Sequence, residues 1–302
     1  MGKIKAWWAA HGPTRRRLIQ VYAAVLYNAH LRGFTEGQIY KGPTKALCVP
    51  GLNCYSCPAA VAACPLGALQ NAVAASAHRP AFYAVGLLLL FGLTLGRTIC
   101  GYLCPVGLMQ ELLYKIPSPK LKKSRATRRL SALKYVLLAV LVLLIPAYYA
   151  WKDFPLPAFC KYVCPAGTLE GAVSLLLHPV NDGLRAGLGM LFTWKAFVLI
   201  AMLIACVFVF RAFCRFLCPL GAIYSLFARI ALLGVRVDES RCTDCGACVK
   251  ICPVDIRRVG DRECVHCGKC IGVCAVKAIS LKAGKITLRE NECRPRGKEA
   301  AE

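Results

Sequence analysis

The chain has 302 residues, of which 57% are hydrophobic, and it carries a formal net charge of +24. A mean hydropathy of +0.52 is too high for a soluble protein of this length and excludes that class. The positive charge does not indicate nucleic-acid binding, because the basic residues flank apolar blocks, where they orient membrane spans. A membrane is therefore the first expected partner, and no nucleic acid is expected.

Four apolar blocks are predicted to cross the membrane, at residues 18–31, 82–99, 132–150 and 193–213. The last three approach the ~20 residues that a helix needs to span a ~30 Å hydrocarbon core. Residues 105–134 hold eight Lys and Arg against the single acid Glu111, which predicts a cytoplasmic loop. We expect a mainly α, multi-pass protein of the cell's inner (cytoplasmic) membrane with four transmembrane helices and both termini cytoplasmic.

A Cys-Pro-x-Gly motif occurs four times, starting at Cys64, Cys104, Cys164 and Cys218. The last three copies have another cysteine four residues earlier: Cys100, Cys160 and Cys214. The first copy is preceded by a looser set: Cys48, Cys54 and Cys57. Proline suits the first turn of a helix, so each copy is predicted to begin a half-helix with cysteine at the N-cap. Free backbone N–H groups there should lower the thiol pKa and favour the thiolate that binds iron.

The predicted topology sorts these cysteines between the two faces of the membrane. One four-thiolate site for a [4Fe–4S] cluster is expected at the cytoplasmic side: Cys100, Cys104, Cys214 and Cys218. Six cysteines remain outside, and the preferred ligand set is Cys57, Cys64, Cys160 and Cys164. The alternative is a local set of Cys48, Cys54, Cys57 and Cys64, with Cys160 and Cys164 as a redox disulfide. A structural disulfide between leftover cysteines stays open.

The sixth residue after each Cys-Pro cysteine is polar: Gln70, Gln110, Glu170 and Tyr224. Two roles are open for these side chains. They could contact a quinone headgroup or relay protons, or they could form hydrogen bonds between helices.

The C-terminal part carries the spacing C-x2-C-x2-C-x3-C twice, which predicts two [4Fe–4S] clusters. In this spacing the fourth cysteine of each run binds the other cluster. The expected ligand sets are Cys242, Cys245, Cys248 and Cys274 for the first cluster, and Cys264, Cys267, Cys270 and Cys252 for the second. A pair of zinc ribbons is the alternative.

Three parts are therefore expected along the chain. Residues 1–37 form a basic cytoplasmic N-terminus and the first transmembrane helix, and residues 38–237 form the membrane domain with the Cys-Pro sites. Residues 238–302 form a small α+β domain of the bacterial ferredoxin kind and a basic tail.

The segments Cys100-Gly-Tyr-Leu-Cys104-Pro and Cys214-Arg-Phe-Leu-Cys218-Pro, followed by the double ferredoxin run, resemble the NapH-like membrane ferredoxins, which are related to the NosR and CcoG types. The resemblance covers roughly residues 80–290. It implies a multi-span protein that passes electrons between quinol or cytoplasmic donors and a redox partner across the membrane. This chain departs from the simplest pattern in its cysteines at 48–64 and 160–164, and in having Ala275 after Cys274.

The expected function is an electron conduit from the cytoplasmic ferredoxin clusters, through intramembrane clusters, to the outer face. Redox proteins on both faces are the expected partners, and the basic tail from Lys277 onward either docks an acidic donor or lies near anionic lipid. Any enzymatic role is that of an electron-transfer component of an oxidoreductase system. The alternatives are a quinol dehydrogenase subunit that feeds a reductase, and an iron–sulfur sensor or assembly factor.

Overall fold

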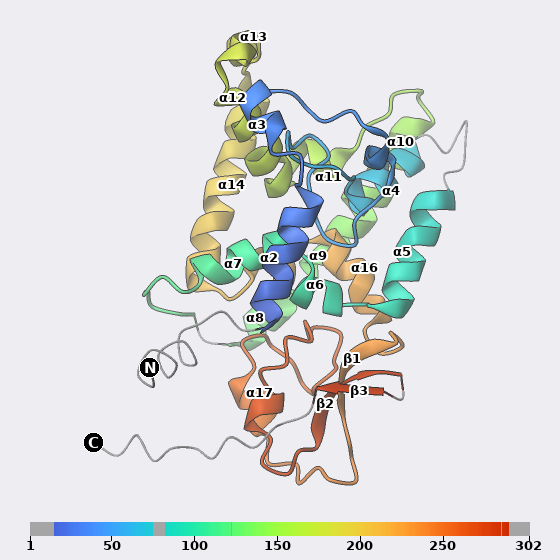
Figure 1. Ribbon diagram of the computed structural model, residues 1–302, viewed down its shortest axis with the longest axis vertical. Coiled ribbons are helices and arrows are strands. Elements are labelled where there is room, and N and C mark those ends of the chain that lie inside the picture. The colour runs from blue at the N-terminus through green and yellow to red at the C-terminus, as the bar shows by residue number, and fades with distance from the viewer. Residues whose placement is uncertain (1–14, 75–81, 122, 285, 290–302) are drawn as a thin grey trace.

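The computed structural model describes residues 15–74, 82–121, 123–284 and 286–289 (Figure 1). A helical domain forms most of the molecule, and a small module with a three-stranded sheet lies at one end of its long axis. Helices α2 (Arg15–Tyr27), α5 (Phe82–Thr94) and α14 (Met190–Phe208) surround a set of shorter helices. The expectation of a mainly helical protein with a small sheet is confirmed.

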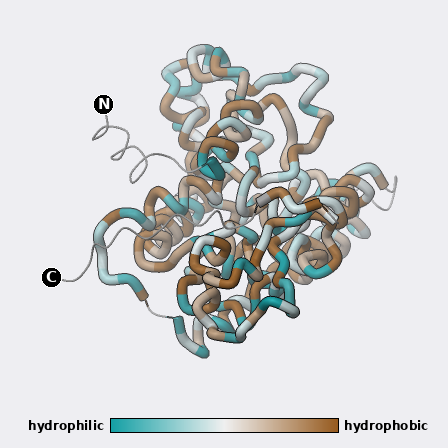
Figure 2. Tube along the Cα trace, turned by 60° about the horizontal axis from the view of Figure 1, so that its bottom comes forward, coloured by the Kyte–Doolittle hydropathy of each residue, from teal (hydrophilic) through white to brown (hydrophobic). Residues whose placement is uncertain are grey.

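The shorter elements of the helical domain follow in chain order. They are α3 (Arg32–Glu36), η1 (Pro43–Ala46), α4 (Pro65–Ala74), α6 (Thr98–Tyr102), α7 (Pro105–Leu113), α8 (Arg125–Leu130), α9 (Leu133–Leu137), the π-helix η2 (Leu138–Leu144), α10 (Ile145–Ala150), α11 (Ala158–Tyr162), the π-helix η3 (Gly167–Val173), α12 (Ser174–Leu176), η4 (Pro179–Asn181), α13 (Asp182–Ala186), α15 (Ala212–Phe216) and α16 (Pro219–Phe227). Hydrophobic segments run through this part of the trace (Figure 2).

Two apolar helices are long enough to cross a membrane, among the residues described. They are the continuous helix Arg125–Ala150, of 26 residues, and α14, of 19 residues. Only 22% and 17% of their most apolar windows are buried inside the protein. A core helix of a soluble protein would be mostly buried, whereas these present residues such as Phe197, Ile200 and Ile204 outward.

The other two predicted spans form shorter helices. Helices α2 and α5 have 13 residues each, a length of about 20 Å. Helix α5 ends at Thr94 because Gly96, with φ of 49°, turns the chain into α6. Residues 95–99 therefore belong to the turn and to the helix that carries Cys100, and they do not extend the span. Residues 75–81, before α5, lie outside the described part.

The Cys-Pro motifs start helices as predicted. Helices α4, α7 and α16 begin at Pro65, Pro105 and Pro219, and a helical segment that continues as η3 begins at Pro165. Three of these half-helices are preceded by a one-turn helix, α6, α11 or α15, which carries the earlier cysteine of the pair. Each Cys-x3-Cys unit is thus a short helix, a turn and a half-helix.

The ferredoxin-like module is built on an antiparallel sheet of β1 (Leu233–Val237), β2 (Ile279–Ala283) and β3 (Ile286–Arg289), in that order. In this sheet Val235 is paired with Leu281, and a bulge follows Leu281 in the β2–β3 pairing. Helix α17 (Ala247–Ile251) carries Cys248 of the first run, and η5 (Ile271–Val273) lies between Cys270 and Cys274 of the second. Strand β1 precedes residue 238, so the sheet includes residues that the expected boundary assigned to the membrane domain.

The module packs closely on the helical domain. A Cβ atom added to Gly101 would lie 2.4 Å from the backbone oxygen of Val265, so only glycine allows this approach. The hydroxyl of Thr98 donates to the carbonyl of Leu233 at 3.1 Å. In the basic segment before α9, the hydroxyl of Thr127 donates to the carboxylate of Asp255 at 2.6 Å. The two Cys-x3-Cys units nearest the module therefore adjoin its cysteines directly.

Candidate iron–sulfur sites

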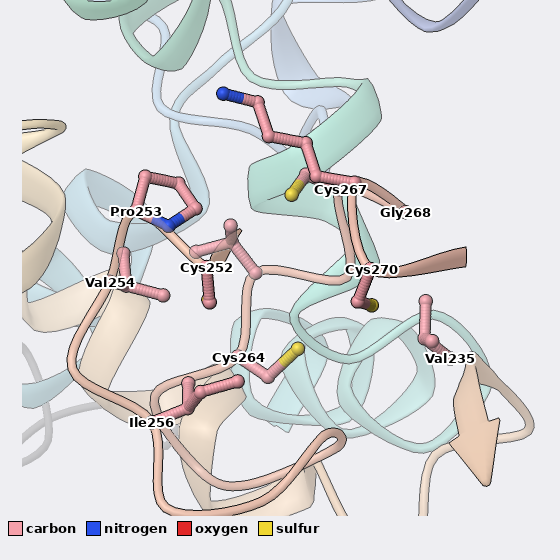
Figure 3. A pocket seen from close by; sticks show the side chains of 11 residues that line it. Val235, Cys252, Pro253, Val254, Ile256, Cys264, Cys267, Gly268 and Cys270 are labelled. Atoms are coloured by element: carbon pink, nitrogen blue, oxygen red, sulfur yellow. The ribbon is translucent and has the colours of Figure 1, made fainter. Parts of the chain in front are cut away.

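Four cysteines line a pocket inside the ferredoxin-like module (Figure 3). The pocket has an empty volume of about 320 Å³, and its cysteines come from both runs: Cys252, Cys264, Cys267 and Cys270. Apolar residues such as Val254 and Ile256 complete its wall. The structure thus brings together the set expected for the second cluster, on the side of the module that faces Gly101.

The other four module cysteines lie toward solvent. The Cys248 thiol is close enough to Cys242 and Cys245 for their charges to interact. Cys274 packs against the same small core as Cys248, and its sulfur accepts the N–H of Ala278 at 3.2 Å. Cys245 is exposed. This set, expected for the first cluster, therefore lies nearer the surface of the module than the pocket set.

A third group of cysteines, called the inner group, joins two Cys-x3-Cys units: Cys100, Cys104, Cys214 and Cys218. All four are buried, and each of the other three thiols interacts electrostatically with Cys218. Cys218 is the N-cap of α16, and its sulfur accepts the N–H of Gly221 at 3.3 Å. The topological pairing and the N-cap position predicted from the sequence are therefore present in the structure.

Buried cations surround the inner group. Arg97 and Arg211 are 1% and 0% exposed, and both interact electrostatically with Cys100 and Cys214. Four cations share two carboxylates: Arg16 and Arg211 (2.7 Å) bind Glu111, and Lys134 (2.6 Å) and Arg97 (3.3 Å) bind Glu263. Four positive charges thus face two negative ones, which leaves a net surplus of positive charge in the described part of this site.

The donor set fits a [4Fe–4S] cluster. Burying uncompensated charge costs several kcal/mol per ion, whereas a cubane on four thiolates brings about two negative charges to the same place. The Nε atom of Arg97 is buried and has no hydrogen-bond partner among the described residues, as expected of a donor aimed at such an anion. Among the described residues, no group of three His, Cys, Asp or Glu side chains is arranged as a site for a single metal ion.

A fourth group, called the outer group, consists of Cys64, Cys160 and Cys164 together with a further cysteine of the segment 48–57. It lies toward the opposite end of the helical domain, near α4 and α11. The sulfurs of Cys160 and Cys164 are within hydrogen-bond reach of each other, and Cys164 interacts electrostatically with both Cys54 and Cys64. The strongest side-chain interactions of Cys57 are with Glu170 and Lys45 instead.

The interaction with Cys164 makes Cys54 a candidate fourth member beside Cys64, Cys160 and Cys164. Cys57 also interacts with Cys54, so the ligand set expected with Cys57 stays a prediction. Cys48 forms a backbone bridge with Ala63 at the rim of the site. Cys160 and Cys164 are free thiols, so the redox disulfide is not formed in this structure. The interaction of Cys64 with Cys164 also disfavours the purely local set of Cys48, Cys54, Cys57 and Cys64.

The expected lowering of thiol pKa by helix N-termini is outweighed at the outer group. The N–H of Gly67 does lower the pKa of Cys64, but burial raises that pKa to about 12. Desolvation penalises the thiolate more than one helix end stabilises it.

The polar residues after the Cys-Pro motifs reach the cysteines of the partner repeat. Gln110 donates from Nε2 to the sulfur of Cys214 at 3.0 Å, and Gln70 donates in the same way to Cys160 at 3.1 Å. Both amides are fully buried, and their oxygens accept backbone N–H groups, from Phe213 and Phe159 respectively. These hydrogen bonds between helices match one of the two roles expected for the glutamines, and a quinone contact there stays a prediction.

Glu170 and Tyr224 occupy the same repeat position and act differently. Glu170 accepts the backbone N–H of Cys54 at 2.7 Å, and burial raises its pKa to about 7. Tyr224 is fully buried, and its hydroxyl donates to the carbonyl of Pro50 at 2.8 Å. Its side chain interacts electrostatically with Cys64 of the outer group and with Cys100, Cys104 and Cys218 of the inner group.

Members of both the inner and the outer group therefore lie near Tyr224. The loop that binds the Tyr224 hydroxyl also contacts both groups. On the inner side, a Cβ added to Gly51 would lie 3.1 Å from the Cα of Cys104. On the outer side, Asn53 donates its backbone N–H to the sulfur of Cys64.

Sequence reasoning missed the two buried arginines. Each stands three residues before the first cysteine of a unit, Arg97 before Cys100 and Arg211 before Cys214. That shared offset inside the repeat is the signal that could have identified them.

Comparison with known proteins supports iron–sulfur chemistry. Two family models, both described as a 4Fe-4S binding domain, match the chain, one at residues 77–124, 135–179 and 190–237 and the other at residues 235–258. No solved structure matches the chain.

The chain is also similar to three named proteins. The chain is 27% identical to the putative electron transport protein YccM of Escherichia coli over 183 residues, 59% of this chain and 47% of YccM. It is 30% identical to the methylamine utilization ferredoxin-type protein MauN of Methylorubrum extorquens over 177 residues, 57% of this chain and 53% of MauN. It is 28% identical to the regulatory protein NosR of Pseudomonas aeruginosa over 166 residues, 53% of this chain and 20% of NosR.

The chain spans about half the length of YccM and MauN and about a fifth of NosR. These matches are consistent with the resemblance to NosR-related membrane ferredoxins. The chain thus carries 4Fe-4S binding domains and is similar to ferredoxin-type electron transport proteins.

Proposed function

We propose that this protein is a membrane-integral electron-transfer protein that connects a ferredoxin module on the cytoplasmic side with a cysteine site near the outer face. The observation that carries the proposal is the arrangement of the four cysteine groups. The solvent-facing set and the pocket set belong to the module at one end of the molecule, and the inner and outer groups belong to the helical domain beside it. Bound [4Fe–4S] clusters would supply one-electron transfer at these groups.

Consecutive groups adjoin through specific residues. Gly101, in the turn between Cys100 and Cys104, lies against the backbone of the pocket set at Val265. Arg211 interacts electrostatically with Cys214 of the inner group and with Cys267 of the pocket set. Tyr224 is shared by the inner and outer groups. Residues of the chain itself thus connect each cysteine group with the next.

The exposed apolar faces support a membrane location. The helix Arg125–Ala150 and α14 turn most of their apolar surface outward, where water would be unfavourable and lipid is not. The shorter α2 and α5 expose Leu and Val on their outer sides, such as Val25 and Leu90, and complete a four-helix periphery. The basic segment 115–134 lies beside the ferredoxin-like module, so the positive-inside rule puts both on the cytoplasmic side.

The half-helices explain how sites could lie within the membrane. Helices α4, α7 and α16 are each only 9 or 10 residues long. Broken helices of this kind place polar or charged sites inside a bilayer while protein buries the free backbone groups. The two buried glutamines use both ends of their amides on protein atoms, so they offer no observation that favours a quinone.

The first test is the iron and acid-labile sulfide content of the full chain purified without oxygen. We expect about 16 iron atoms per chain, four cubanes. Cys214→Ser and Cys160→Ser should each lower this by about four iron atoms, and Cys206→Ser, which removes a buried thiol outside the four groups, is the matched control. A content near about eight iron atoms would confine the clusters to the ferredoxin-like module and would overturn the proposal.

The second test asks whether electrons cross a bilayer. The protein is reconstituted in vesicles that enclose an oxidised redox dye, and dithionite is added outside. Reduction of the enclosed dye should depend on protein and should be lost in both Cys214→Ser and Cys160→Ser. Reduction that survives in both variants would contradict a conduit, and protein-free vesicles correct for leakage.

A further inference from the structure

The two buried arginines of the inner group are arranged with an approximate twofold symmetry. Arg211 lies against Gly107 of the second repeat, where an added Cβ would be 3.4 Å from its Cζ. Arg97 lies against Gly221 of the fourth repeat, where an added Cβ would be 3.5 Å from its Nη2. Each arginine therefore reaches across to the Cys-Pro-x-Gly turn of the opposite unit.

The outer group lacks this pair. The residue three before Cys160 is Pro157, so the position that corresponds to Arg211 is apolar. A carboxylate is present instead, because Glu170 accepts the N–H of Cys54. The cations near the outer group are lysines. Lys45 donates to the carbonyl of Ala60 at 2.5 Å and interacts electrostatically with Cys54 and Cys57, Lys195 donates to the carbonyl of Cys160 at 3.5 Å, and the half-buried Lys161 follows Cys160 in the chain.

The two groups are otherwise matched. Each has one buried glutamine that donates to a cysteine sulfur, at 3.0 Å in the inner group and 3.1 Å in the outer group. Because the reduction potential of a [4Fe–4S] site depends on nearby charge, on hydrogen bonds to sulfur and on exposure, the matched amides leave charge as the main difference. Positive charge stabilises the more negative, reduced form, and its effect is strongest where it is buried.

We infer that Arg97 and Arg211 are potential-setting residues that keep the inner site at a higher reduction potential than the outer site. Their surplus charge is only partly offset, since Glu111 is shared with Arg16 and Glu263 is shared with Lys134. The inner site is then the first of the two to take up one electron from a reductant. This inference rests on the proposed function, because it needs a cluster at each group.

The test is a potentiometric titration with dithionite, followed by electron paramagnetic resonance, on the full chain in detergent. Cys214→Ser and Cys160→Ser assign the signals, since each should remove one of them. The signal lost in Cys214→Ser should appear at the higher potential. Arg97→Gln and Arg211→Gln should each reduce the equilibrium constant for reduction of that site at least tenfold, which is about 59 mV for one electron, and should move the other signal less.

Three further variants keep the test decisive. Arg97→Lys should retain most of the wild-type potential because the charge is kept. Glu111→Gln should shift the reduction potential of the inner site upward, opposite to the shift expected in the arginine variants. This measurement remains possible even if the arginine variants do not fold. Arg125→Gln removes an exposed positive charge from α8 and should shift neither signal.

The outcomes separate the two ideas. Wild-type iron content with an inner potential unchanged in Arg97→Gln, Arg211→Gln and Glu111→Gln would overturn the inference and leave the conduit standing. An outer potential above the inner one in the wild type would also overturn it. Absence of the signal assigned by Cys214→Ser, with about four iron atoms fewer than expected, would contradict the proposed function itself.

Discussion

The side-chain amide of Gln110 donates a hydrogen bond to the sulfur of Cys214 at 3.0 Å, across two repeat units that are 104 residues apart in the chain. The same glutamine accepts the backbone N–H groups of Phe213 and Cys214 through its oxygen. One fully buried side chain thus fixes both the position of a candidate ligand and the start of its helix. Gln70 and Cys160 repeat the arrangement in the other half of the domain.

Replacing Gln110 by leucine should destabilise the protein. The substitution leaves two buried N–H groups without an acceptor, and each such group costs about 1–3 kcal/mol. We expect a lower midpoint of thermal unfolding and loss of iron from the inner site on mild heating. Gln70→Leu should affect the outer site in the same way, and an unchanged unfolding midpoint in both variants would contradict the structural role of the amides.

Single cysteine variants should distinguish the outer ligands. Cys54→Ser is expected to lose about four iron atoms per chain, because the Cys54 thiol interacts with Cys164. Cys57→Ser and Cys48→Ser should keep the wild-type iron content. The reverse pattern, with iron lost only in Cys57→Ser, would restore the ligand set expected from the sequence.

Gly101 should tolerate no side chain. In Gly101→Ala the new methyl group would meet the Val265 carbonyl at 2.4 Å, and neither backbone can move without separating the module from the inner group. We expect full iron content but faster amide hydrogen exchange at residues 262–266 and slower electron exchange with the module. Gly272→Ala is the matched control within the same module, because nothing lies within 4 Å of its added Cβ. Equal exchange in both variants would mean that the close approach is not required.

Tyr224→Phe removes the hydroxyl that donates to Pro50 at 2.8 Å while keeping the ring. The loss leaves a buried carbonyl without its donor, so we expect a destabilisation of about 1–3 kcal/mol. Iron content should be retained, since the ring still separates the two groups. Tyr148→Phe, at an exposed tyrosine, should leave the free energy of unfolding unchanged. A similar loss in both variants would argue against a specific role for the Pro50 contact.

Several features of the site were predictable from the sequence because they depend on local spacing. A proline directly after a cysteine starts a helix at that point, and this prediction holds for Cys104 and Cys218. The pairing of Cys100 with Cys214 followed from counting crossings between them, even though α5 proved shorter than the apolar block that suggested the crossing. The pocket set of the ferredoxin-like module followed from the spacing alone.

Other features depend on contacts between distant segments and could not be read from spacing. Arg97 meets Glu263 across 166 residues, and Arg16 meets Glu111 across 95. In the sequence these residues are charges beside apolar blocks, and such charges are normally interpreted as determinants of membrane topology. That they are buried, and that their electrostatic effect is therefore strong, becomes apparent only from the packing of the ferredoxin-like module on the inner group.

The cysteine runs and the Cys-Pro repeats alone predict iron–sulfur ligands and the half-helices that present them. The folded chain adds the contacts between distant repeats, such as Cys54 near Cys164, and the buried charges around each group. The physical reason is range. Helix starts and ligand spacing are local properties of a few consecutive residues, whereas the electrostatic environment of a buried site is the sum of side chains brought together from the whole chain.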